Sequence, residues 1–258
     1  MDIQYTELPF ESGTVRLEYA WLNAAQRDAP LVVFLHEALG TLAMWRDFPE
    51  RLCDVGGFRG LLYSRYGHGG STARERWPLD YLECEARQLL PDFLRATGAD
   101  VRPWLFGHSD GASIALIHAA AFPDALAGAV VLAPHIFVED ATVAGVAAAR
   151  RNYETTDLRQ RLGRYHRDPD GVFWRWHDRW VDPAFRTWNI EALLPAIRCP
   201  LLVIQGEDDE YATMAQLDGI KRQVPQAELL KLPDCRHSPH RDQPQQVIDA
   251  ALRFVRTR

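Results

Sequence analysis

The pentapeptide Gly-His-Ser-Asp-Gly at 107–111 constrains this chain more than any other stretch, because of what flanks it. An apolar run at 103–106 precedes it, and a run of small residues at 112–120 follows it. This order predicts a strand, a tight turn and a helix, in which a G-x-S-x-G turn lifts the serine hydroxyl clear of a sheet. Glycine at each end lets backbone and helix approach without a Cβ clash. Ser109 is therefore a candidate nucleophile, the alternative being a turn serine in a glycine-rich loop.

Apolar runs and helical spacing alternate along most of the chain. Besides the strand before the turn, a strand covered on both faces is predicted at 31–35, and further strands are predicted at 59–63, 126–133, 201–205 and 228–232. Helices are predicted at 45–54, 79–97, 212–223 and 244–255. Alternating residues at 3–8 and 15–21 predict an antiparallel hairpin. The pattern indicates an α/β fold with a mostly parallel sheet covered on both faces and an N-terminal hairpin.

The alternation breaks between residues 136 and 195, which are rich first in alanine and arginine and then in aromatic residues. This segment has helical character and is too long for a simple crossover. We interpret it as a helical cap at 136–195, inserted into a core formed by 1–135 and 196–258.

Composition excludes several classes of protein. The chain has 258 residues, 47% of them hydrophobic, and a formal net charge of −6. These values predict a folded domain without the basic surface of a nucleic-acid-binding protein. No apolar run approaches the roughly 20 residues of a membrane helix, and the acidic first seven residues are unlike a signal peptide. We expect a cytoplasmic monomer or homodimer that acts on a small molecule, away from membranes.

A nucleophilic serine requires a base, and the base requires a carboxylate that orients it. In this topology, the acid should follow the serine and the histidine should follow the acid. Carboxylates occur at 207–210, directly after the strand 201–205, and His237 follows the strand 228–232. His240 is a rival base, and Glu139 with Asp140 offers an alternative acid after an earlier strand.

Two backbone N–H groups are also needed to bind the oxyanion of an acyl-transfer intermediate. One is expected from Asp110, which follows the nucleophile, and the other from the loop 36–40 after the first parallel strand, with Glu37 as the donor. Both donors carry carboxylates. Two carboxylates at this place would oppose a negative charge unless they point away or are paired.

The chain resembles the α/β-hydrolase superfamily, especially its compact capped esterases, lactonases and carbon–carbon bond hydrolases. The resemblance spans nearly the whole chain and is carried by Leu35–Gly40, Gly67–Ser71, Gly107–Gly111, Gly206–Asp209 and His237 with Asp242-Gln243-Pro244 after it. It implies that the acid lies three residues after the strand-end glycine, which falls on Asp209, with Asp208 as the runner-up. The chain departs from the family pattern where Glu37 and Arg236 stand in place of glycines.

The resemblance and the residues together predict a serine hydrolase with the catalytic set Ser109, Asp209 and His237. The expected substrate is a small or medium, largely apolar carboxylic ester or lactone, since an aromatic cap favours a closed, apolar pocket. A carbon–carbon bond hydrolase acting on a diketone-like ring-fission product, or a weakly catalytic small-ligand receptor, would use the same fold. No cofactor or metal is expected, because His36-Glu37 lacks the second histidine of a zinc motif. His135 is either a pocket residue or a partly exposed loop residue.

Overall fold

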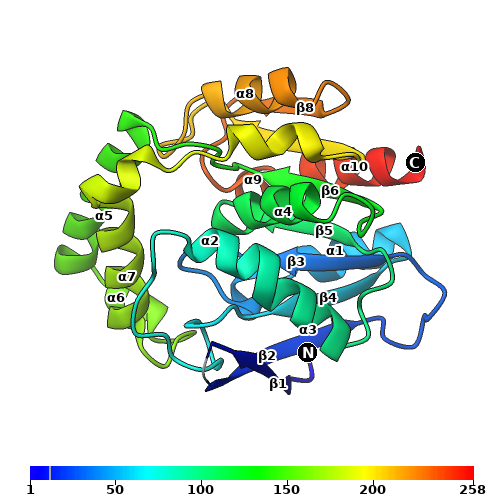
Figure 1. Cartoon of the computed structure of the whole chain (residues 1–258), viewed down its shortest axis with the longest axis horizontal. Coiled ribbons are helices and arrows are strands. Elements are labelled where there is room, and N and C mark those ends of the chain that lie inside the picture. The colour runs from blue at the N-terminus through cyan, green and yellow to red at the C-terminus, as the bar shows by residue number, and fades with distance from the viewer. Residues whose placement is uncertain (12) are drawn as a thin grey trace.

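The computed structural model describes residues 1–11 and 13–258, and an eight-stranded sheet runs through its centre (Figure 1). The spatial order of the strands is β1-β2-β4-β3-β5-β6-β7-β8. Their bounds are β1 Gln4–Phe10, β2 Gly13–Leu22, β3 Leu31–Leu35, β4 Arg59–Tyr63, β5 Trp104–His108, β6 Gly128–Leu132, β7 Leu201–Gly206 and β8 Glu228–Leu232.

Strand pairing confirms the predicted fold class. β1 pairs antiparallel with β2, and β2 pairs antiparallel with β4. From β4 to β8 every neighbouring pair in the sheet is parallel. In the register of β3 and β5, Leu35 lies beside Gly107, so the loop after β3 meets the predicted serine turn. The carboxyl ends of the parallel strands share one edge, where sites form in open α/β sheets.

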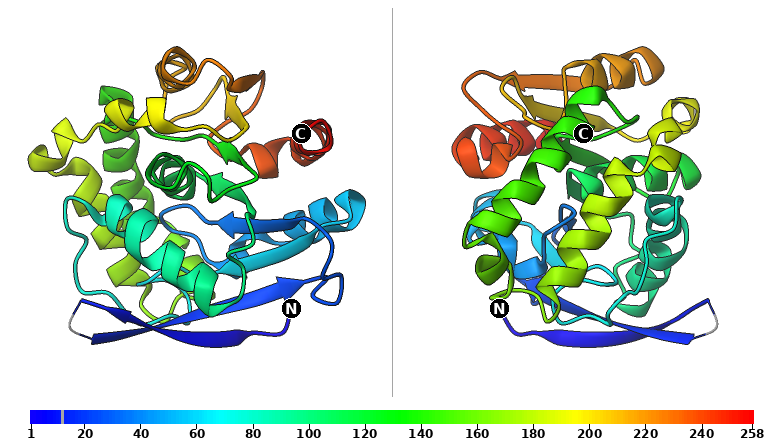
Figure 2. Two further views of the ribbon diagram at one scale, coloured as in Figure 1. Left: turned by 45° about the vertical axis from the view of Figure 1, so that its right-hand side comes forward. Right: turned by 90° about the vertical axis from the view of Figure 1, so that its left-hand side faces the viewer.

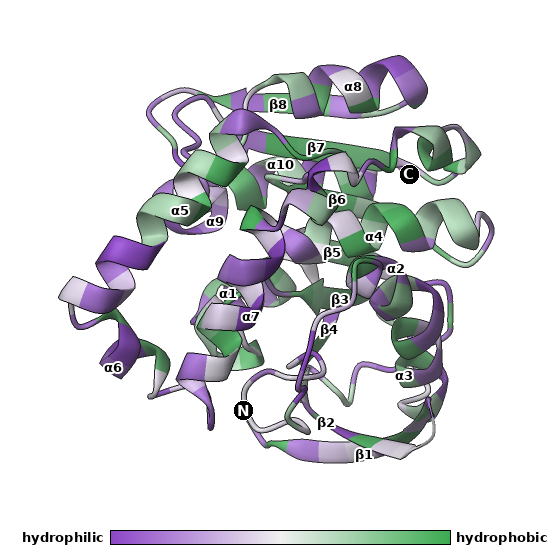
Figure 3. Cartoon of the chain, turned by 60° about the vertical axis from the view of Figure 1, so that its left-hand side comes forward, coloured by the Kyte–Doolittle hydropathy of each residue, from purple (hydrophilic) through white to green (hydrophobic). Residues whose placement is uncertain are grey.

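Alternating side chains of each central strand feed two separate cores. In β3, Leu31, Val33 and Leu35 belong to one buried cluster, while Val32 and Phe34 belong to the other. This period of two follows from the pleat of a strand. It also explains why the central strands read as continuous apolar runs, since both of their faces are buried. Figure 3 shows hydrophobic residues gathered along these strands.

Helices cover both faces of the sheet (Figure 2). One face packs on helices of the first cluster and the other on helices of the second. The first group comprises α2 Tyr81–Cys84, α3 Leu90–Ala96, α4 Asp110–Ala121 and α8 Ala215–Gln223. The second comprises α1 Phe48–Gly56 and α10 Pro244–Arg256, with the short α9 Pro239–Asp242 before α10. A 3₁₀ turn, η1, spans Leu42–Trp45.

The helix predicted at 79–97 differs from the continuous helix that its spacing suggested. A π-helical turn, η2 at Glu85–Leu89, separates α2 from α3. Pro91 follows this turn and has no backbone N–H, so it cannot make the regular hydrogen bond to the fourth residue before it. Gly98 follows the end of the helical stretch, with a φ of +66° that suits glycine.

The segment between β6 and β7 is mostly helical. It contains α5 Asp140–Thr155, α6 Leu158–Leu162, α7 Pro169–Val181 and the 3₁₀ turns η3 Pro183–Thr187 and η4 Glu191–Ala196. In Figure 1, α5, α6 and α7 stand beside the sheet at one end of its central strands. The division into core and cap stays a prediction. No helix in the described part of the chain is long and apolar enough to span a bilayer.

Gly111 permits a close approach of α4 to the sheet, and its replacement should therefore lower stability. A Cβ at Gly111 would lie 2.0 Å from the backbone oxygen of Leu35, which cannot move aside like a flexible side chain. We expect Gly111→Ala to lower the free energy of unfolding by about 3 kcal/mol or more, measured by urea denaturation. Gly13→Ala is the control, because a Cβ there meets nothing within 4 Å. Equal stabilities of the two variants would contradict this account.

Candidate active site

Ser109 occupies a strained turn between β5 and α4. Its φ of 53° and ψ of −117° are rare for a residue with a side chain. The turn is held by the Ser109 N–H, which donates to the Leu132 carbonyl of β6 at 2.9 Å. A Cβ at Gly107 would lie 2.4 Å from the Gly111 carbonyl oxygen, so only glycine fits there. The strand, turn and helix predicted around the pentapeptide are present.

Ser109, His237 and Asp209 form one chain of hydrogen bonds. Nε2 of His237 lies 2.9 Å from Oγ of Ser109, and its Nδ1 lies 2.8 Å from Oδ1 of Asp209. Asp209 follows β7 and His237 follows β8, so both reach Ser109 from the carboxyl edge of the sheet. The side chain of Asp209 is fully buried, whereas Asp208 is exposed. The geometry thus brings together the three predicted residues, with Asp209 beside the histidine.

Backbone groups fix the carboxylate of Asp209 toward the imidazole. Its Oδ1 accepts hydrogen bonds from the N–H groups of Tyr211 at 2.9 Å and Ala212 at 3.2 Å. The N–H of His237 donates to Oε2 of Glu210 at 3.2 Å. The ring of Tyr211 packs 4.8 Å from that of His237, measured between centroids. Acid and base are therefore held by the same loop.

The pKa of His237 is set by competing effects. Burial alone would lower it, but the charge of Asp209 and its hydrogen bond outweigh burial, and the pKa of His237 is raised above its ordinary value of 6.5. The pKa of Asp209 changes in the complementary direction: burial would raise it, but the charge of His237 and its hydrogen bond lower it below the ordinary value. By contrast, burial lowers the pKa of His108, His135 and His240.

The rival residues lie elsewhere. His240 is buried against Trp45, with ring centroids 4.8 Å apart, and is not bonded to Ser109. The carboxylate of Glu139 accepts hydrogen bonds from the Thr213 N–H at 3.0 Å, just before α8, and from Nε2 of Gln216 in α8 at 2.7 Å. Asp140 pairs with Arg186. His135 lines the cavity described below, and its ring centroid lies 5.8 Å from that of His237.

The two carboxylates that the sequence places near the oxyanion site are both engaged. Oδ2 of Asp110 accepts hydrogen bonds from the Tyr81 hydroxyl at 2.9 Å and from Nη2 of Arg65 at 3.4 Å. Oε2 of Glu37 accepts from the Leu39 N–H at 2.7 Å. The charge of Asp110 is therefore balanced by that of Arg65. The Glu37 carboxylate is hydrogen-bonded to a backbone N–H of its own loop. Sequence reasoning missed Arg65 and Tyr81. The position of Arg65, two residues after the end of β4, was a signal, because that strand ends at the same edge.

A cavity of about 290 Å³ opens beside Ser109 and His237. Its far wall comes from α5, α6 and α7 and is mostly apolar, with Val146, Ala149, Leu162, Phe173, Trp176 and Trp180 beside the polar Thr142 and Asn152. Glu37, Asp110 and Glu210 line the other side. The volume lies at the lower end of the range for small-molecule sites. Across residues 1–11 and 13–258, no group of three or more His, Cys, Asp or Glu side chains is arranged to hold a metal ion.

The mostly parallel sheet covered by helices indicates the α/β-hydrolase fold. A comparison with known protein families agrees with it. Residues 32–250 match the model of the alpha/beta hydrolase family. The chain belongs to this family.

Three known proteins illustrate the likeness. The chain is 26% identical to the 2-succinyl-6-hydroxy-2,4-cyclohexadiene-1-carboxylate synthase of Enterobacter sp. (strain 638), with 92% of this chain and 95% of that protein covered. It is 29% identical to the human serine hydrolase BPHL, covering 68% of this chain and 61% of the other. Its fold matches a thermophilic esterase from Thermogutta terrifontis with a TM-score of 0.76, 21% identity and 98% of each chain covered.

Proposed function

We propose that this protein is a serine hydrolase that cleaves a small or medium, largely apolar carboxylic ester or lactone through an acyl-enzyme on Ser109. The observation that carries the proposal is the hydrogen-bonded chain from Ser109 through His237 to Asp209, which ends in a mostly apolar cavity. Membership of the hydrolase family supports the reaction class.

In the proposed reaction, Ser109 Oγ attacks the substrate carbonyl while its proton moves to Nε2 of His237. Asp209 accepts the Nδ1 hydrogen bond of the imidazole, fixes its tautomer and stabilises the imidazolium. His237 then gives the proton to the leaving alkoxide as the acyl-enzyme forms. In the second half-reaction, His237 deprotonates water, which attacks the acyl carbonyl. The imidazolium then returns the proton to Oγ of Ser109 as the acyl–oxygen bond breaks, which releases the acid and regenerates Ser109.

The oxyanion that forms at each attack is bound by the backbone N–H of Asp110 and by an N–H from the loop 36–40. Asp110 begins α4, so its N–H has no acceptor within the helix. Glu37 remains the predicted loop donor. Ala38 is a second candidate: the Glu37 carbonyl accepts hydrogen bonds from the interior, and in a trans peptide the next N–H points the opposite way. Both residues line the cavity.

The charges of the cavity favour a neutral substrate. Among the described residues that line it, Arg241 is the one with a permanent positive charge, and it is exposed. The carboxylates of Glu37 and Glu210 line the same space. A substrate with a carboxylate near its reacting carbonyl would meet this negative field without a buried cation to pair with. An uncharged ester or lactone meets no such penalty, and its acyl group packs on the apolar wall.

The test combines substrates with an active-site label. We expect the purified protein to hydrolyse p-nitrophenyl esters of short and medium acids with an initial burst of nitrophenol, and to open apolar lactones. A fluorophosphonate should label the tryptic peptide that contains Ser109, as found by mass spectrometry. A vinylogous diketone, offered in parallel, should not be cleaved.

Two results would overturn the proposal. Cleavage of the diketone with negligible ester turnover would identify a carbon–carbon bond hydrolase. Absence of labelling, together with tight binding of an unreacted ester, would identify a receptor of the same fold.

A further inference from the structure

Arg65 connects the two backbone segments that flank Ser109. It follows β4 and is only 1% exposed, although it carries a charge. Its Nη2 donates to the backbone carbonyl of Glu37 at 3.1 Å and lies 3.4 Å from Oδ2 of Asp110. Glu37 belongs to the loop after β3, and Asp110 is the first residue of α4. A single nitrogen thus joins the two segments to which the proposed oxyanion donors belong.

The loop segment is held from the interior by side-chain donors. Each carbonyl from Glu37 to Leu39 lies within hydrogen-bonding distance of a ring nitrogen of a buried imidazole. The pairs are His36 Nδ1 with Glu37 O at 2.7 Å, His68 Nε2 with Ala38 O at 2.9 Å, and His166 Nε2 with Leu39 O at 2.9 Å. These bonds turn the carbonyls inward. Three histidines and Arg65 thus contact the carbonyls of this loop. Of these four side chains, only Arg65 also contacts Asp110 among the described residues.

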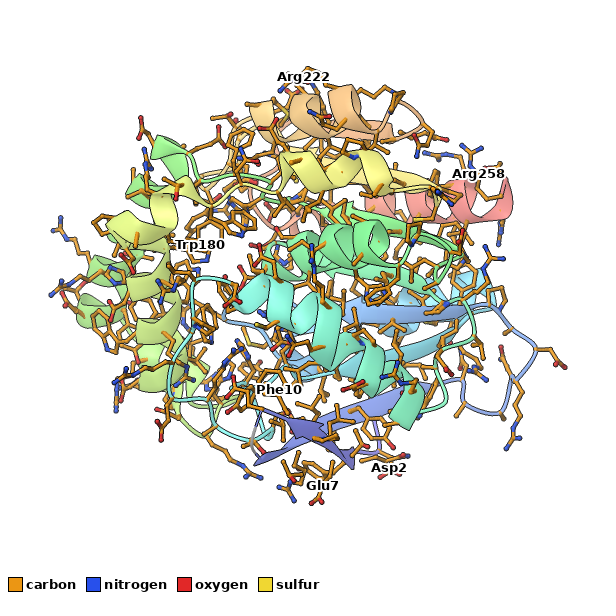
Figure 4. The ribbon with its side chains drawn as sticks, in the orientation of Figure 1. Asp2, Glu7, Phe10, Trp180, Arg222 and Arg258 are labelled. Atoms are coloured by element: carbon orange, nitrogen blue, oxygen red, sulfur yellow. The ribbon has the colours of Figure 1, made fainter. Side chains whose placement is uncertain are left out.

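The helix segment is held by a second chain of donors. Oδ2 of Asp110 accepts the hydroxyl of Tyr81 at 2.9 Å, and that hydroxyl accepts Nε1–H of Trp180 at 3.1 Å. Trp180 belongs to α7, and Figure 4 shows it on the side of that helix facing the sheet. Asp110 is therefore held between Arg65 and Tyr81 of α2, and Tyr81 is in turn bonded to α7. Its position decides where the first N–H of α4 points.

The charge of Arg65 is sustained by its surroundings. Burial opposes the charge, but the carboxylates of Asp110 and Glu85 outweigh burial and raise the pKa of Arg65 above its ordinary value. Arg65 therefore stays charged and paired with Asp110, and it holds in place the peptide dipoles of both proposed oxyanion donors. Preorganised dipoles and charges of this kind stabilise a developing oxyanion most where water is excluded.

We propose that Arg65 is the positioning residue of the oxyanion site, holding the Glu37 loop and the start of α4 at the spacing that an oxyanion requires. The inference rests on the proposed function. Arg65 touches neither Ser109 nor the substrate in this scheme, and acts through the peptide groups that it fixes. Its removal should therefore weaken binding of the transition state much more than binding of the substrate.

The test compares Arg65→Met with Arg74→Met. Arg74 is a matched control because it is also buried, at 4% exposure, and lies 3.7 Å from Glu85, while its described contacts do not include the loop 36–40 or Asp110. For Arg65→Met we expect kcat for a p-nitrophenyl ester to fall about 10²-fold, with KM changed less than about threefold. Arg65→Lys should recover part of kcat, since it restores a cation and a donor.

A second readout is independent of activity. Hydrogen–deuterium exchange should accelerate at 37–40 and at the first turn of α4 in Arg65→Met, but not in Arg74→Met. Removing one partner of a buried ion pair is destabilising, so the double variant Arg65→Met with Asp110→Asn is measured against Asp110→Asn alone. This comparison leaves no unpaired carboxylate at 110 and serves if the single variant fails to fold.

The outcomes separate this inference from the proposed function. A folded Arg65→Met protein with unchanged exchange, or with kcat within about threefold of the wild type, overturns the positioning role. An equal fall of kcat in Arg74→Met does so as well, because it would show a general effect of losing a buried arginine. A wild-type protein without ester turnover refutes the proposed function, while the exchange comparison still decides whether Arg65 holds the two segments.

Discussion

Ser109→Ala is expected to lower kcat/KM for a p-nitrophenyl ester by about 10⁴-fold or more. The variant retains the cavity, His237 and the backbone donors, so substrate still binds, but no oxygen is present to form the acyl-enzyme. Burst kinetics and fluorophosphonate labelling should both disappear. The free energy of unfolding should change by about 1 kcal/mol or less, because the lost hydroxyl makes one side-chain hydrogen bond, to His237, at the border of the cavity.

Ser113→Ala provides the opposite pattern. Ser113 lies one turn further along α4, and its hydroxyl donates to the carbonyl of His135 at 2.7 Å and accepts from the His135 N–H at 3.1 Å. Its loss leaves buried backbone groups without a partner and should cost about 1–3 kcal/mol of stability, while labelling at Ser109 persists. Ester turnover by Ser109→Ala above about 1% of the wild-type value would contradict the nucleophile assignment.

Sequence patterns predicted the framework well for a physical reason. Strands buried on both faces are apolar without interruption, so β3 was located to the residue at 31–35. β4 and β8 were also located to the residue, at 59–63 and 228–232, although β8 is an edge strand in which Glu228 and Lys231 are exposed. Residues directly after such strands must lie at one edge, which made the meeting of Ser109 with His237 predictable. Glycine spacing added Asp209, and the hydrogen bonds of the structure place that carboxylate beside the histidine.

The sequence could not show how the interior is balanced. The partners of Asp110 come from the loop after β4 and from α2, which are distant in the chain, and which of them point inward depends on packing. Local spacing likewise did not reveal the π-helical turn Glu85–Leu89 or the short helix Pro239–Asp242. The two carboxylates expected near the oxyanion site, Glu37 and Asp110, therefore looked unfavourable from the sequence. In the structure Asp110 is paired with Arg65, and Glu37 is hydrogen-bonded within its own loop.

Asp209→Asn carries the second large expected effect. Asparagine fills the same space, but its amide can donate to Nδ1 of His237 and so favours the tautomer with the proton on Nε2. That tautomer cannot accept the proton of Ser109, and kcat should fall by about 10³- to 10⁴-fold. Asp208→Asn is the matched control, since its side chain is exposed and the same charge is removed one residue away. Equal losses in the two variants, or a larger loss in Asp208→Asn, would assign the acid to Asp208 or to neither.

The same pair of variants predicts how activity depends on pH. His237 must be neutral to act as the base, so kcat/KM of the wild type should fall as the pH drops through the pKa of His237. That pKa is raised above 6.5 chiefly by Asp209, against the lowering effect of burial. In Asp209→Asn the acidic limb of the profile should move to lower pH, and in Asp208→Asn it should stay. An unmoved limb in Asp209→Asn would mean that another group controls this ionisation.

Stability should follow the opposite direction along the pH axis. A histidine whose pKa is raised on folding stabilises the native state fully below its unfolded pKa of about 6.5, and this contribution is lost as the pH rises through the folded pKa. Asp209, whose pKa is lowered, stays ionised until the pH falls well into the acid range. Asp209→Asn should therefore lose more free energy of unfolding, relative to the wild type, at a pH of about 5.5 than at a pH of about 9. Urea denaturation at the two pH values measures it, and a deficit that grows toward alkaline pH would show that the ion pair does not act as the geometry indicates. The residue that makes His237 an effective base above neutrality is then also the one that stabilises the fold below it.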